Sequence, residues 1–148
     1  MHIFQKWGDD VMAFDESIRS ISLNADASLA VYTGVPGLPG SADPNYGKQY
    51  RFVKVTGAST VGLCTANTDN SIGVMQSKPQ VTGQAATIAI RGVSFIMSGA
   101  AIAAGAKVTT DSTGRAITVP GSGSPVTYGV SITATDAAGE LVSVLLKN

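Results

Sequence analysis

The sequence has few charged residues and few residues of the kinds that perform chemistry. Charged side chains make up 14% of the 148 residues, against about 25% in an ordinary soluble domain. Ten cations balance ten anions. A nucleic-acid binder needs excess Lys and Arg to neutralise phosphates, so we expect no nucleic-acid partner. With 44% hydrophobic residues, the chain is also too apolar for intrinsic disorder.

Long hydrophobic runs are also missing. The most apolar stretch, residues 96–106, is interrupted by Ser98, Gly99 and Gly105, whereas a membrane-spanning helix needs about 20 apolar residues. No long apolar run follows Lys6, so the N-terminus does not resemble a signal peptide. We therefore expect no membrane partner and synthesis in the cytoplasm.

Cysteine and histidine occur once each, as Cys64 and His2. A single cysteine cannot form an intrachain disulfide, and its position between Leu63 and Thr65 on a predicted strand favours a small core residue over a reactive thiol. The five acidic residues of the second part of the chain fall at predicted turns or strand ends, where solvated charges are common: Asp43, Asp69, Asp111, Asp136 and Glu140. We therefore expect no catalytic residue and no enzyme.

Metal and cofactor motifs are incomplete. Asn67, Asp69 and Ser71 have the alternate spacing of oxygen ligands in a calcium loop, but the glycine and the bidentate glutamate of that loop are missing. The glycine-rich stretch 121–123 lacks the Gly-Lys-Ser/Thr ending of a phosphate-binding loop. We expect neither a metal nor a cofactor.

The residues that are abundant favour β-structure. Gln49–Thr56 alternates apolar and polar side chains, and Gly57–Ser59 predicts a turn into Thr60–Thr65. Further short apolar segments are separated by turn residues: 71–76, 86–91, 93–97, 107–110, 116–119, 128–134 and 141–146. This regular spacing predicts an all-β fold, a compact barrel or sandwich of short antiparallel strands.

The N-terminal part differs in composition from the rest. Pro36, Pro39 and Pro44 interrupt both helix and strand, which predicts an extended connector. We divide the chain into an N-terminal extended arm, residues 1–42, and a β-domain, residues 43–148. Two cations and five anions give the arm a net charge of −3, and eight cations and five anions give the domain +3.

Four of the nine aromatic residues lie in the arm, and we predict that they include interface anchors: Phe4, Trp7, Phe14 and Tyr32. Asp9–Arg19 could form two turns of helix, whereas Ile18–Leu23 could equally form a strand. Two interpretations of the whole arm also stay open. It packs on its own domain, or it reaches a neighbouring subunit of a larger assembly.

The β-domain resembles a known family in the order and spacing of its segments. Over about residues 46–147, the sequence is similar to the capsid cement, or decoration, proteins of tailed phages. The resemblance is carried by Phe52–Gly57, Ser71–Gln76, Ala89–Ser94, Ala103–Ala116, Gly129–Ser131 and Gly139–Leu146. It does not extend to residues 1–42.

This resemblance implies a structural protein that binds the outer surface of the virion's icosahedral capsid and bridges neighbouring major capsid protein subunits. It implies self-association, as a trimer rather than a dimer, and no catalytic residues. If the arm makes these contacts, deletion of residues 1–32 is expected to leave a folded core but weaken binding to the capsid.

Two other functions remain open. One is a surface-binding module for host adhesion or glycans, displayed on a virion, with exposed aromatics such as Tyr46, Tyr50 or Tyr128 at the site. The other is a β-clip accessory domain of an enzyme, suggested by the turn pattern in Ile102–Thr109. The chain lacks the catalytic domain that would accompany the latter.

Overall fold

The computed structural model describes residues 18–30 and 48–147, and over these residues the chain is all-β, as predicted. Nine strands and no helix occur in this part of the chain. The strands are β1 (Arg19–Ala25), β2 (Phe52–Gly57), β3 (Thr60–Leu63), β4 (Ser71–Met75), β5 (Ala85–Met97), β6 (Lys107–Thr110), β7 (Ala116–Thr118), β8 (Gly129–Ser131) and β9 (Leu141–Leu146). All but β5 have seven residues or fewer, as the frequent turn residues predict.

Five strands close a small barrel. They lie in the order β1-β3-β2-β4-β5, and β1 also pairs with β5 to complete the ring. Strand β1 is parallel to β3 and antiparallel to β5. The side chains that fill this barrel come from all five strands and the turn after β1: Ala25, Leu29, Val53, Val61, Met75, Ala86 and Ile88.

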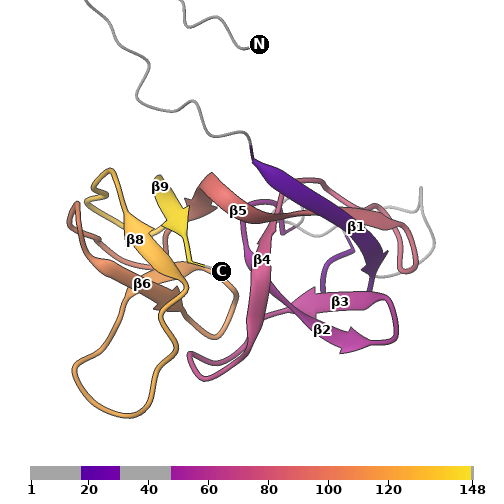
Figure 1. Ribbon diagram of the computed structural model, residues 1–148, viewed down its shortest axis with the longest axis horizontal. Coiled ribbons are helices and arrows are strands. Elements are labelled where there is room, and N and C mark those ends of the chain that lie inside the picture. The colour runs from indigo at the N-terminus through magenta and orange to yellow at the C-terminus, as the bar shows by residue number, and fades with distance from the viewer. Residues whose placement is uncertain (1–17, 31–47, 148) are drawn as a thin grey trace, which may run out of the picture.

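The remaining strands form a second sheet that shares β5 with the barrel. Its order is β5-β9-β8-β6-β7, and Figure 1 shows β5 running between the two groups of strands. The 13 residues of β5 pair with β1 and β4 in the first half and with β9 from Gly92 onward. Gly92 has a φ of 97°, a backbone conformation that other residues rarely adopt, and it marks the exchange of partners. The predicted segments 86–91 and 93–97 are therefore one strand that changes its partner at this glycine.

A second core lies between the barrel and this sheet. Phe52 and Val53 are both fully buried on opposite faces of β2, so Val53 fills the barrel while Phe52 packs outward. The Phe52 ring meets the Tyr128 ring edge-on at a centroid distance of 4.9 Å. Strands β2 and β5 are therefore buried on both faces, one face in each core, and this joins the two groups of strands.

The described part of the N-terminal region belongs to the barrel. Residues 19–25 form β1, and Leu29 and Ala30 are buried beyond it. The boundary expected at residue 42 assigns these residues to the arm, whereas the structure packs them on their own β-domain. The strand interpretation of Ile18–Leu23 is confirmed from Arg19 onward. Nearly all of the alternative helix, Asp9–Arg19, lies outside the described residues.

Candidate assembly surface

The single cysteine is a core residue. The Cys64 side chain is fully buried and belongs to the core between the barrel and the second sheet. Burial raises the pKa of this thiol to about 12, although a hydrogen bond with Ser71 acts in the opposite direction. The group is therefore a protonated thiol at neutral pH rather than a nucleophile. His2 lies outside the described residues.

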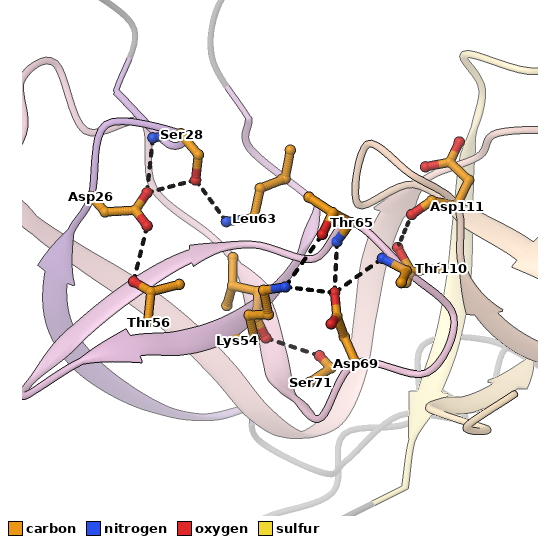
Figure 2. Close-up of polar contacts among 12 residues, drawn as sticks. Asp26, Ser28, Lys54, Thr56, Leu63, Thr65, Asp69, Ser71, Thr110 and Asp111 are labelled. Atoms are coloured by element: carbon orange, nitrogen blue, oxygen red, sulfur yellow. Dashed lines mark hydrogen bonds and ion pairs between the residues drawn. The ribbon is translucent and has the colours of Figure 1, made fainter.

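Asp69 holds the loop between β3 and β4 together. Its Oδ2 atom accepts hydrogen bonds from the backbone N–H groups of Thr65, at 2.7 Å, and Ala66, at 3.0 Å, and pairs with Lys54 Nζ at 2.9 Å (Figure 2). Burial raises the pKa of this carboxyl, but the hydrogen bonds from Lys54, Thr65 and Ala66 outweigh it, and the net pKa is lowered. Asp69 is the carboxylate of the three residues with calcium-loop spacing, and its Oδ2 atom accepts hydrogen bonds from groups of the protein itself.

Asp111 and Asp26 organise turns in the same way. Asp111 accepts hydrogen bonds from the backbone N–H groups of Thr113, at 2.8 Å, and Arg115, at 3.0 Å, and its carboxylate pairs with the Arg115 Nε at 2.8 Å. Asp26 accepts from Thr56 Oγ1 at 2.9 Å and ties the end of β1 to β2 (Figure 2). No group of three or more His, Cys, Asp or Glu side chains able to hold a metal ion occurs in the described ranges. The structure has no membrane-spanning helix over residues 18–30 and 48–147.

Within the described residues, an exposed apolar face lies on the second sheet, formed by the outward side chains of β5, β8 and β9. The strand register places Val93 opposite Leu145 and Met97 opposite Leu141, and Val130 of β8 opposite Leu145. Phe95 is 53% exposed, Leu141 45% and Leu145 43%. We call these six residues, Val93, Phe95, Met97, Val130, Leu141 and Leu145, the apolar face. Exposed large apolar side chains that share one face of a sheet are typical of an interaction site.

A groove of about 330 Å³ lies at one edge of the apolar face. Its lining combines apolar and polar side chains: Ile18, Tyr50, Gln76, Val93, Ser94, Phe95 and Ser143. The Tyr50 ring meets the Phe95 ring edge-on at 6.2 Å. Tyr50 has a φ of 61°, and backbone hydrogen bonds to Met75 and Met97 hold it there. The groove therefore presents an aromatic pair on a fixed backbone.

Two arginines are close in sequence to residues that line this groove. Arg19, next to Ile18, is directly opposite Arg91 in the pairing of β1 with β5, and both side chains are exposed. Neither forms an ion pair with any acid of the described ranges. Like charges that face each other across strands are destabilising, so this pair favours an acidic partner.

The interface residues predicted from the sequence are not among those that the structure describes. Phe4, Trp7, Phe14 and Tyr32 all lie outside the described residues, as does Tyr46. Of the other tyrosines, Tyr128 is buried in the core, whereas Tyr50 lines the groove. The apolar face was missed because β5 and β9 carry apolar residues on both sides, and their sequence alone does not tell which side is covered.

A family model for phage cement proteins matches residues 47–146 of this chain. The chain belongs to the phage cement protein family. This match covers strands β2 to β9 and confirms the resemblance seen in the sequence. No curated protein matches this cement protein.

The fold of this cement protein is also found in a solved structure. It is similar to the N base of the head fiber gp8.5 of bacteriophage phi29, with a TM-score of 0.58 and 16% sequence identity. The similarity covers 87% of this chain and 95% of the other. At this identity the comparison shows a shared fold.

Proposed function

We propose that this protein is a structural component of a phage head that decorates the outer capsid surface and stabilises it by bridging neighbouring major capsid protein subunits. The observation that carries the proposal is the cement family match over residues 47–146. The apolar face, with Phe95 53% exposed, adds a surface suited to association. The fold shared with a head fiber base of phage phi29 supports the same setting.

The mechanism needs binding and no catalysis. A protein that binds the assembled shell but not its dissociated subunits stabilises the shell by linkage. A homo-oligomer, which we propose to be a trimer, makes every contact after the first effectively intramolecular and can gain about 10²–10⁴ in affinity. The low net charge of the chain favours such packing over repulsion.

The aromatic residues of the N-terminal segment are proposed contact residues in this assembly. Phe4, Trp7, Phe14 and Tyr32 are of the types that dominate binding energy at interfaces. Deletion of residues 1–32 is a poor test of this role, because it also removes β1 from the barrel. Deletion of residues 2–17 keeps every described strand and is expected to lower occupancy on the capsid.

Co-sedimentation with expanded phage heads tests the proposed function. The protein is mixed with purified heads that lack it, pelleted, and quantified against the major capsid protein. We expect saturable binding with a copy number that fits the three-fold or two-fold positions, and heads that resist heat or low salt better when decorated. Absence of binding to heads, with stable copurification with a soluble enzyme, would contradict the proposal.

The groove supports a second candidate function, a surface module that binds glycans of the host. Tyr50 and Phe95 provide aromatic surface, and Gln76, Ser94 and Ser143 provide polar groups beside it. Binding on a glycan array that is lost in Tyr50→Ala, with unchanged binding to heads, would favour this function.

A further inference from the structure

We propose that residues 1–17 cover the apolar face of their own β-domain in the free protein. The aromatic side chains of the segment would pack on Phe95 and Tyr50, and its acidic residues would lie near Arg19 and Arg91. This inference concerns the free subunit and does not depend on the capsid.

The position of Ile18 is the first argument. Ile18 lines the groove together with Phe95 and Val93, and it directly follows residues 1–17 in the chain. The segment therefore joins the β-domain at the edge of the apolar face. At roughly 3.3 Å per extended residue, it is long enough to cross three strands spaced about 4.8 Å apart.

The second argument is the chemistry of the segment. Residues 1–17 contain apolar side chains of several sizes: Ile3, Phe4, Trp7, Val11, Met12 and Phe14. The face they would cover has three large side chains more than 40% exposed, Phe95, Leu141 and Leu145. Burial of apolar surface contributes about 25 cal/mol of favourable free energy per Å², so packing of the segment on the apolar face is favourable.

The third argument is charge. The segment has one lysine against four acids, Asp9, Asp10, Asp15 and Glu16, a net charge of −3. Arg19 and Arg91 face each other across β1 and β5 without an acidic partner in the described ranges. An acidic segment beside this pair removes an unfavourable repulsion between strands, and the charges also fix the register of the docking.

The covalent link between residues 1–17 and the β-domain favours docking on the same chain over docking on a second copy. A segment joined to the edge of its binding surface has an effective concentration on the order of millimolar, which exceeds ordinary protein concentrations. The intramolecular contact is therefore favoured in the free subunit. In an oligomer, the same contact can be exchanged between copies, as in domain swapping.

Trp7, the only tryptophan, reports directly on this contact in the full chain. We expect an emission maximum at short wavelength and slow quenching by acrylamide, both unchanged on dilution. Phe95→Glu should shift the emission to longer wavelength and speed the quenching. The control, Val55→Glu, changes a residue that is 54% exposed on β2, outside the apolar face, and should leave the emission unchanged.

Two further substitutions test the contribution of charge to this docking. Arg91→Glu should shift the emission in the same direction, by less than Phe95→Glu, and Lys78→Glu, in the exposed stretch between β4 and β5, should not. Thermal melts followed by circular dichroism verify that each variant is folded, and Phe95→Ala replaces Phe95→Glu if the latter is not.

Three results would overturn the inference. Solvent-exposed Trp7 in the wild-type chain would show that the segment is undocked. A buried Trp7 whose emission is unchanged in both Phe95 variants would show that the segment docks at another surface. Emission that moves to longer wavelength on dilution would show docking on a second copy. Because no heads are present, none of these results bears on whether the protein binds capsids.

Discussion

Cys64 lies at the centre of the molecule, in the core that joins the barrel to the second sheet. We predict that it does not react with a thiol reagent such as DTNB in the folded protein and reacts at once after unfolding in urea. Burial, which raises the pKa of this thiol to about 12, keeps it in the unreactive protonated form. Rapid reaction of the native protein would contradict this prediction.

The same thiol makes stability fall at alkaline pH. Its pKa is about 8.5 in an unfolded chain and higher in the folded protein, so above pH 8.5 ionisation favours the unfolded state. At pH 10 this loss amounts to about 2 kcal/mol. Urea titrations at pH 7 and pH 10 measure it, and Cys64→Ala is the control, since it should lose less stability over this interval than the wild type.

Asp69 gives the opposite dependence on pH. The folded state holds the pKa of its carboxyl below the ordinary value, so its contribution is fully present above about pH 4 and is lost as pH falls through the folded pKa. Asp69→Asn is expected to destabilise the protein by about 1–3 kcal/mol at pH 7, since hydrogen bonds to a charged acceptor are lost.

At acidic pH, where protonation of Asp69 removes the charge that these hydrogen bonds stabilise, the effect of the same substitution should be smaller. Free energies of unfolding from urea titrations at the two pH values measure the difference. Asp136→Asn, at an exposed residue of the turn between β8 and β9, is the control and should have little effect at either pH. An equal effect of Asp69→Asn at both pH values would show that its charge is unimportant.

Strands β4 and β5 lie close together at Gly73. Gly73 has a φ of 155°, and a Cβ atom there would lie 2.0 Å from the backbone oxygen of Ala89. Because a backbone atom cannot move aside cheaply, we expect Gly73→Ala to destabilise the protein by about 3 kcal/mol. Urea denaturation measures this loss. Gly121→Ala, whose Cβ would have open space, should change stability little.

How far the strands could be predicted depended on whether their partners are close in sequence. The β2–β3 hairpin follows from alternation and a short turn, and β9 was predicted at its observed bounds. Strand β1 was harder, because it pairs with β5, more than 60 residues away, and because Ala25 is its single buried residue. The candidate surface depends on the same long-range pairing, since only the β5–β9 register brings Phe95 and Leu145 onto one face.

At the scale of the whole molecule, β1 closes the barrel between β3 and β5. Two truncations separate this role from that of the preceding segment. Deletion of residues 2–17 keeps β1, and we expect the thermal unfolding to stay cooperative. Deletion of residues 2–30 removes β1 and the buried Leu29 and Ala30, and opens unpaired edges on β3 and β5. We expect that variant to lose cooperative unfolding or to aggregate.

Circular dichroism melts and size-exclusion chromatography of the two truncated chains measure these outcomes. The pair is informative because the two variants differ only in residues 18–30, so a difference between them reports on β1 and the turn after it. Removal of a whole core residue such as Leu29 alone costs about 2–5 kcal/mol, a large part of the stability of a small domain. Equal, cooperative unfolding of both variants would show that β2–β5 hold the barrel without β1, and the N-terminal region could then leave the domain as a whole.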